Sequence, residues 1–238
     1  MGEPLPFDEK MVPPTYSQRV ADPKTYFEYH KNSIADIEAF WGRVAEELEW
    51  FRKWDKVLVP GEHPNVYRWF VGAETNISYL CLDRHVRTWR RNKVAIIWEG
   101  EPVDEKGNPK ERRVLTYFDL WRLVNRIAFA LRRLGVRRGS RVAIYMPMIP
   151  ELPAVMLACA RLGAVFTVVF SGFTSENLAM RMRDLGAQFL ITADGFYRRG
   201  RVIELKKVAD EAIRLYDGIE KVVVVRRLMS EVPMREGR

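Results

Sequence analysis

The chain has 238 residues, of which 47% are hydrophobic and 29% are charged, so it has enough apolar material for a large core and is not wholly disordered. Lysine and arginine (39) outnumber aspartate and glutamate (31), and the net charge of +8 favours a polyanionic ligand or partner without identifying it. No stretch approaches about 20 consecutive apolar residues and no signal-peptide segment is present, so we expect a soluble, cytoplasmic protein without a membrane span.

The amino-terminal region is rich in proline and aromatic residues. Residues 1–14 contain four prolines and are expected to form an arm on another surface or a loose tail. From Ile34 to Phe51, apolar residues recur at helical spacing and predict an amphipathic helix. Four of the seven tryptophans lie within residues 41–69, which we interpret as an aromatic-rich segment that wraps onto a larger body. A helix over 81–89, a strand over 94–98 and a polar loop over 104–113 are expected next.

After residue 114 the pattern becomes a regular alternation of strands and helices. Thr116 and Asp119 form a variant of the capping box at the start of a helix that ends at Gly135. Such an alternation predicts an α/β fold with a mostly parallel sheet and helices on both faces. We therefore divide the chain into a wrap and start of the large domain (1–113) and a strand–helix portion (114–238). The expected strands are 142–146, 164–170, 188–192 and 222–225, and the expected later helices are 151–162, 175–185 and 201–216.

Two loops at the carboxyl ends of these strands are candidate ligand sites, because open parallel sheets bind ligands there. Gly172 follows the strand 164–170, has no side chain, and precedes a helix amino terminus, so backbone can approach an anion closely. The alternative is that Gly172 only permits a turn. Arg198 and Arg201 lie where the next helix is expected to begin, and guanidinium groups there suit phosphate. The alternative for them is a solvated basic face.

Other polar residues carry less information about function. Basic residues at the opposite edge of the sheet and on a helix exterior are predicted to be structural. They are Arg132, Arg133, Arg137, Arg138, Arg141, Lys206 and Lys207. The two cysteines and three histidines are scattered, which predicts neither a disulfide framework nor a metal site. Since the common phosphate-loop, dinucleotide, hydrolase and zinc-protease motifs are also missing, the residues alone predict a phosphate site but no reaction.

Seven ordered segments stand out along the chain: FW (40–41) with LEW (48–50), NISY (76–79) with CLDRH (81–85), AIIWEG (95–100), LTY (115–117), YMPMIPE (145–151), LACARLGAV (157–165) and FSGF (170–173). Together they resemble a known family, the AMP-forming acyl-CoA synthetases of the adenylate-forming superfamily, and within it those that act on acetate. Their order and spacing extend the resemblance from about residue 34 to the end of the chain.

The resemblance implies a two-step acetate–CoA ligase reaction. A short carboxylate, acetate or another, reacts with ATP in the presence of magnesium to give an acyl-adenylate, and coenzyme A then displaces AMP. Family members hold the nucleotide phosphates of coenzyme A with a glycine and two arginines, which match Gly172, Arg198 and Arg201. Ser171 replaces what is often a second glycine. No catalytic residue and no metal ligand is assigned within this chain.

The same resemblance implies that the chain is incomplete. The family's ATP phosphate loop, adenine and acyl sites and catalytic lysine lie beyond Arg238, so we expect an amino-terminal portion of the adenylate-forming fold that is inactive alone. The missing carboxyl-terminal portion is then a candidate partner. The alternatives are a basic α/β nucleic-acid-binding module or an assembly module without acyl-activating activity. Only Phe196 and Tyr197, beside Arg198, place aromatic rings among basic residues, so we do not favour nucleic acid.

Overall fold

The structure is a computed structural model that describes residues 23–235, and the chain divides between Thr75 and Asn76 into two compact units. Residues 76–113, the later part of the segment that we described as the wrap and start of the large domain, lie in the second unit. The proline-rich residues 1–14, expected to be an arm or tail, lie outside the described residues. No helix of the described part is long and apolar enough to cross a membrane.

The first unit contains two helices and one antiparallel pair of strands. The single helix expected from Ile34 is wrong, because Asp36 interrupts it. Asp36 is extended, with φ −143°, and its side chain accepts a hydrogen bond from the backbone N–H of Ala39 at 2.9 Å, so it ends one helix and caps the next. The elements are α1 (Pro23–Ala35), α2 (Ile37–Ala45), β1 (Lys56–Pro60) and β2 (Tyr67–Val71).

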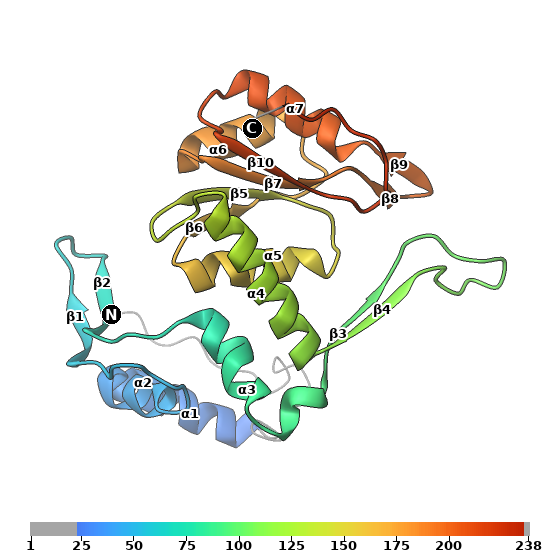
Figure 1. The fold of residues 1–238 in the computed structure, drawn as a ribbon. Helices are drawn as coiled ribbons and strands as arrows, with labels where there is room; N and C mark the ends of the chain where they lie inside the picture. The colour runs from blue at the N-terminus through green and yellow to red at the C-terminus, as the bar shows by residue number, and fades with distance from the viewer. Residues whose placement is uncertain (1–22, 236–238) are drawn as a thin grey trace. The chain divides into compact units, whose positions relative to one another are not determined.

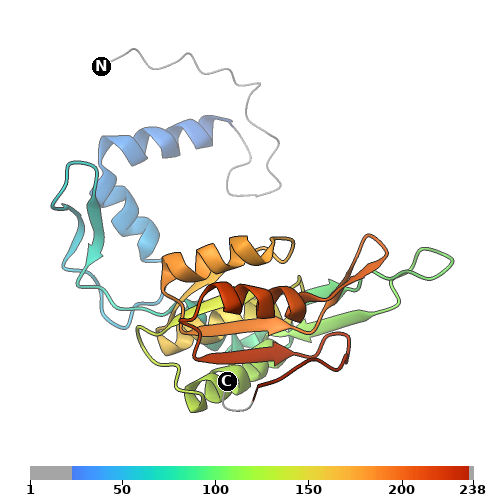
Figure 2. The same ribbon diagram turned by 90° about the horizontal axis from the view of Figure 1, so that it is seen from above.

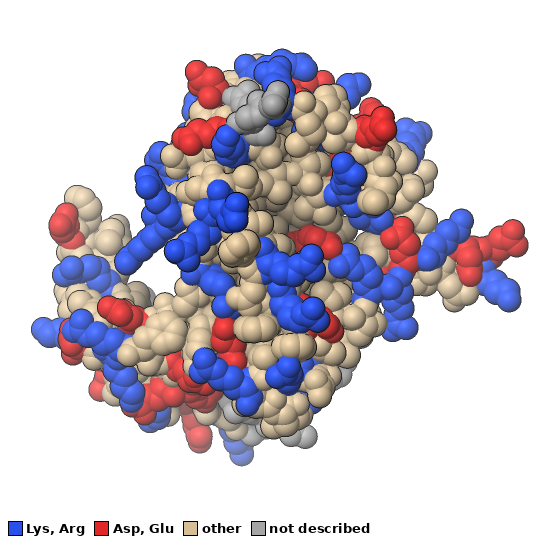
Figure 3. Space-filling view, viewed as in Figure 1, with Lys and Arg blue, Asp and Glu red and all other residues tan. Residues whose placement is uncertain are grey.

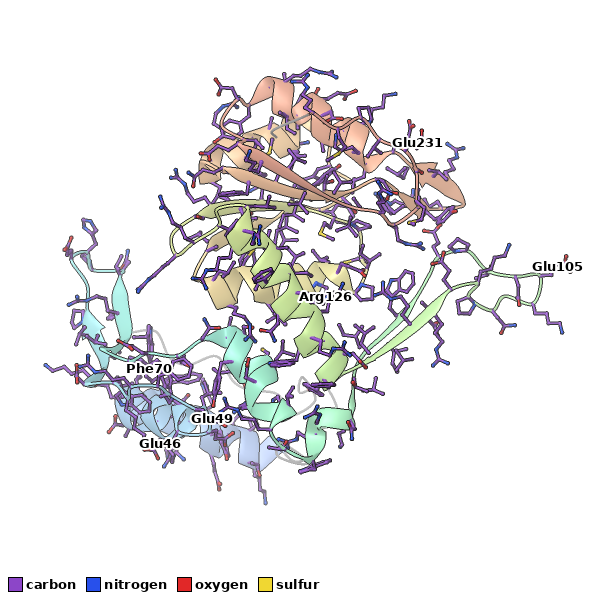
Figure 4. All side chains as sticks on the ribbon, viewed as in Figure 1. Glu46, Glu49, Phe70, Glu105, Arg126 and Glu231 are labelled. Carbon is purple, nitrogen blue, oxygen red and sulfur yellow. The ribbon has the colours of Figure 1, made fainter. Side chains whose placement is uncertain are left out.

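A cluster of partly buried aromatic residues lies in the first unit. The rings of Trp50, Trp54 and Phe70 have centroids 5.2–5.4 Å apart, and the Trp50 indole donates to the carbonyl of Ala45 at 2.8 Å. Phe70, labelled in Figure 4, has a φ of +48°, a backbone conformation that is unusual for an aromatic residue. Packing therefore holds Phe70 in this conformation. The expectation that this region wraps onto a larger body stays a prediction.

The second unit is built on a four-stranded parallel sheet (Figure 1). Its strand order is β10-β7-β5-β6, so the predicted strands 142–146, 164–170 and 188–192 are neighbours and the predicted α/β class is confirmed. The capping box of Thr116 and Asp119 is also present. The strands are β5 (Arg141–Tyr145), β6 (Val165–Val168), β7 (Phe189–Ala193) and β10 (Lys221–Val225). The helices are α4 (Tyr117–Arg133), α5 (Glu151–Leu162), α6 (Ser175–Leu185) and α7 (Leu205–Leu215).

Both faces of this sheet are covered by helices, as expected. Val142 and Ile144 of β5 are fully buried in a cluster with residues of α4 and α5, whereas Ala143 and Tyr145 are buried with residues of α6 and α7. Alternate residues of a strand point to opposite faces, so a strand covered on both sides is apolar throughout. Figure 2 shows the same sheet and helices from above.

Shorter elements complete the second unit. The helix expected over 81–89 is a π-helical turn, a short α-helix and a 3₁₀ turn. Asp83 ends the π turn and accepts hydrogen bonds from the Trp121 indole and the Arg161 guanidinium, which joins this segment to α4 and α5. The elements are η3 (Tyr79–Asp83), α3 (Arg84–Val86), η4 (Trp89–Asn92) and the antiparallel pairs β3 (Val94–Glu99) with β4 (Arg112–Thr116) and β8 (Phe196–Arg198) with β9 (Arg201–Ile203). Glu105 lies at the tip of the β3–β4 hairpin (Figure 4).

Lysine and arginine side chains lie over much of the face drawn in Figure 3, with a group over α4. Not all basic residues are on the exterior, however. Lys206, predicted to lie on a helix exterior, is only 5% exposed. Its ammonium group donates to both carboxylate oxygens of Asp210, at 2.7 and 2.8 Å, and to the carbonyl of Pro233 at 2.8 Å. The prediction was wrong because the segment after β10 packs against α7 and covers this lysine.

Candidate functional site

The candidate site lies at the carboxyl-terminal edge of the parallel sheet. Gly172 belongs to the loop between β6 and α6, and Arg198 and Arg201 belong to the β8–β9 hairpin that follows β7. Because β5, β6 and β7 are parallel neighbours, the loops after them leave the sheet at the same edge. The fold thus brings together two loops that are separated in the sequence.

The two arginines are cross-strand partners in a tight hairpin. Arg198 pairs with Arg201, and the two residues between them, Arg199 and Gly200, have φ values of +53° and +72°. Positive φ at both central residues is typical of a type I′ turn, which twists in the sense that the strands require. Directly opposed residues in such a hairpin project to the same face, so both guanidinium groups can reach one ligand.

This hairpin corrects the expectation of a loop to Gly200 followed by a helix from Arg201. The helix α7 begins at Leu205, so Arg201 is in a strand and the helix dipole does not act on it directly. The argument from unpaired amides and dipole at a helix start is therefore withdrawn for Arg201. The sequence signal for a hairpin was present, because a two-residue loop ending in glycine between short strands is typical of a type I′ turn.

Gly172 and Arg198 are in direct contact. A Cβ atom built on Gly172 would collide with Nη1 of Arg198 and would lie 2.7 Å from Cε1 of Phe170. The guanidinium carbon of Arg198 lies 5.3 Å from the centroid of the Phe170 ring. No side chain fits at residue 172 without displacing the arginine, so the backbone of Gly172 and the Arg198 guanidinium form one continuous surface.

Among residues 23–235, neither Arg198 nor Arg201 forms an ion pair with a carboxylate. The backbone of the hairpin does contact an acidic side chain, since the N–H of Gly200 donates to a carboxylate oxygen of Glu101 at 2.9 Å. Two unpaired guanidinium groups on one face favour an anionic ligand, and their fork of donors suits phosphate.

A pocket of about 310 Å³ adjoins Arg198. Its wall includes Arg227, which donates to Glu111 at 2.9 Å and lies 5.0 Å from the Trp98 ring and 5.9 Å from the Tyr197 ring. The Tyr197 ring is thus in contact with a guanidinium group of the protein itself. The lining residues are Trp98, Glu99, Glu101, Pro147, Met148, Ile149, Phe170, Ser171, Phe196, Tyr197, Arg198 and Arg227.

The sequence analysis missed Asp194, which organises this edge of the sheet. Its carboxylate is 3% exposed and accepts hydrogen bonds from the backbone N–H groups of Gly195, Arg227, Leu228 and Ser230, at 2.7–3.0 Å. It thereby ties the start of the β8–β9 segment to the loop after β10. An aspartate followed by glycine at the end of an apolar strand was the available signal, but the sequence does not reveal which N–H groups it meets.

The other reactive side chains lie elsewhere. Cys159 is fully buried in α5, and burial raises the pKa of its thiol to about 12, so it does not supply a thiolate near neutral pH. Within the described part of the chain, no group of three or more His, Cys, Asp or Glu side chains is arranged to hold a metal ion. The chemistry that this site supports is therefore the binding of an anion by backbone and guanidinium groups.

The chain is similar in sequence to known proteins. Residues 82–234 match the family model described as AMP-binding enzyme, and residues 26–81 match the model described as acetyl-coenzyme A synthetase N-terminus. An acetyl-coenzyme A synthetase from Pyrobaculum aerophilum is 51% identical over 236 residues, which cover 98% of this chain and 35% of that protein. A 3-hydroxypropionyl-coenzyme A synthetase from Sulfurisphaera tokodaii is 46% identical over 90% of this chain and 32% of its own length.

A solved structure is also similar. The acetoacetyl-CoA synthetase from Streptomyces lividans matches with a TM-score of 0.76 and 29% identity, over 87% of this chain and 31% of that one. The chain thus spans about a third of the length of the proteins that it matches.

Proposed function

This chain belongs to the AMP-binding enzyme family, and from that premise we propose that it is the amino-terminal part of a cytoplasmic acetate–CoA ligase and holds the nucleotide phosphates of coenzyme A. The complete reaction would convert a carboxylate, ATP and coenzyme A to acyl-CoA, AMP and pyrophosphate. The observation that supports the proposal is the proximity of Gly172 to Arg198 and the pairing of Arg198 with Arg201, two arginines that form no ion pair within residues 23–235.

Each of these residues has a distinct part in the proposed site. Arg198 and Arg201 donate charge-assisted hydrogen bonds to phosphate oxygens from one face of the hairpin. Gly172 lets a phosphate approach the loop backbone, because a side chain there would collide with Arg198. Positioning of coenzyme A, rather than proton transfer, is the contribution of this chain to the second half-reaction.

We assign the other substrates to the part of such enzymes that this chain does not span. By resemblance, the residues that hold ATP and the catalytic lysine lie in that part, and the described residues offer no cluster for magnesium. We propose acetate or another short carboxylate as the acyl donor, since the similar proteins are named for acetyl and 3-hydroxypropionyl groups. The missing carboxyl-terminal portion would be the partner of this chain.

The 238-residue chain alone is expected to show no acetate-dependent exchange of pyrophosphate into ATP, because it lacks the groups that would bind the triphosphate. Adding the carboxyl-terminal portion of the Pyrobaculum aerophilum relative is expected to produce both this exchange and the formation of acetyl-CoA. The assay measures labelled ATP with acetate and magnesium present, and each portion assayed separately is the control. Exchange by the chain alone, or no activity from the combined portions when both are folded, would contradict the proposal.

A further inference from the structure

We infer that Tyr145 is a positioning residue for coenzyme A, whose hydroxyl holds the loop around Gly172 in the conformation that receives the phosphates. The inference rests on the proposed function and adds to it a residue that does not touch the ligand. Tyr145 is the last residue of β5 and is 1% exposed. Its ring packs in the cluster between the sheet and helices α6 and α7.

The Tyr145 hydroxyl group forms its hydrogen bonds with the loop that carries Gly172. The Tyr145 hydroxyl oxygen lies 2.7 Å from the carbonyl of Phe173 and 3.2 Å from the carbonyl of Ser171. Ser171 and Phe173 flank Gly172, so one buried hydroxyl holds the peptide group just before the glycine, between residues 171 and 172, and the one between residues 173 and 174. The loop is otherwise tied by the backbone bonds from Val169 to Ile144 and from Phe173 to Phe170, at 2.8 and 3.0 Å.

Because the loop contains a glycine, its conformation depends on hydrogen bonds from residues outside the loop. Gly172 has no side chain to restrict its backbone, so the loop would sample more conformations if the hydroxyl were absent. The Arg198 guanidinium packs directly on Gly172, and a change in the loop would also move the surface against which this arginine rests. Burial raises the pKa of Tyr145 to about 12, so the hydroxyl keeps its proton and remains a donor at neutral pH.

Tyr145→Phe removes only the oxygen atom and keeps the buried ring. We expect coenzyme A to bind this variant of the 238-residue chain about threefold to tenfold more weakly, as loss of one neutral hydrogen bond predicts. Amide hydrogen exchange of residues 171–174 should become faster, while exchange within β5 and β7 stays unchanged. Affinity is measured by isothermal titration calorimetry with coenzyme A.

Tyr216→Phe is the matched control. Tyr216 also donates its hydroxyl to a backbone carbonyl, that of Ala187 at 3.0 Å, but at the opposite end of the neighbouring strand β7. This variant should keep the affinity for coenzyme A within about twofold, although it loses a comparable hydrogen bond.

A third variant, Arg201→Ala, separates the inference from the proposed function. If Arg201→Ala weakens binding but Tyr145→Phe does not, the phosphate site stands and the role of Tyr145 is wrong. Equal weakening by Tyr145→Phe and Tyr216→Phe would show a general loss of stability and would also overturn the role of Tyr145. If the unsubstituted chain does not bind coenzyme A, or Arg201→Ala has no effect, the proposed function fails and the inference fails with it.

Discussion

Replacing Asp194 by alanine is expected to lower the free energy of unfolding by about 3 kcal/mol, because one buried and three partly buried N–H groups lose their acceptor together. Asp194 is 3% exposed, and its carboxylate accepts hydrogen bonds from the backbone N–H groups of Gly195, Arg227, Leu228 and Ser230. The cost of an unsatisfied buried donor is about 1–3 kcal/mol for each group that water does not reach after the change. Local opening would let water reach some of these N–H groups, so the total loss of stability stays well below the sum of the individual costs.

Urea-induced unfolding of the 238-residue chain measures this effect. Asp184→Ala is a suitable control, since Asp184 is an exposed aspartate on α6. The control should change the free energy of unfolding by less than about 0.5 kcal/mol. Equal stability of the Asp194→Ala and Asp184→Ala chains would show that Asp194 does not hold the loop after β10 in place.

Gly172→Leu is expected to weaken the binding of coenzyme A by about a hundredfold, or about 2.7 kcal/mol. The Cβ atom alone would collide with the Arg198 guanidinium and crowd the Phe170 ring, and the larger leucine side chain would also cover the loop backbone. The variant would therefore displace one charge-assisted contact and block the approach of a phosphate.

Calorimetric titration with coenzyme A measures this loss, and Gly172→Ala provides a graded comparison. Alanine adds only the Cβ atom, so Arg198 can shift by a small amount and the loss should be smaller. Because Gly172 is exposed on a loop, the thermal unfolding midpoint of both variants should stay close to that of the unsubstituted chain. Unchanged affinity in the leucine variant would mean that coenzyme A does not approach this loop.

The regular part of the second unit could be predicted from the sequence because local pattern and tertiary structure agree there. Strands β5 and β7 are buried on both faces, and their apolar runs reflect this directly. Helix α4 begins at a capping box that is formed entirely within four consecutive residues, 116–119. The helix expected from Ile34 was wrong because Asp36 adopts an extended conformation and caps a second helix. The helix expected over 81–89 is divided into a π turn, a short α-helix and a 3₁₀ turn, a division that its sequence pattern did not reveal.

The candidate site could be predicted only in part. The residue types of Gly172, Arg198 and Arg201 suggested phosphate, and the family resemblance selected them, but neither revealed that the glycine contacts Arg198. The contributions of Asp194 and Tyr145 were not predictable, because each depends on backbone groups from distant parts of the chain. A tyrosine inside an apolar strand is indistinguishable in sequence from any other buried aromatic residue.

The central claim is that Arg198 and Arg201 bind the nucleotide phosphates of coenzyme A. Its most direct test compares the affinities of the chain for coenzyme A and for dephospho-coenzyme A, which lacks the 3′-phosphate. We expect the unsubstituted chain to prefer coenzyme A by about tenfold or more, as one charge-assisted contact predicts. The double variant Arg198→Ala, Arg201→Ala should bind both thiols weakly and equally. A double variant that keeps the preference for coenzyme A, or an unsubstituted chain that has none, would contradict the assignment.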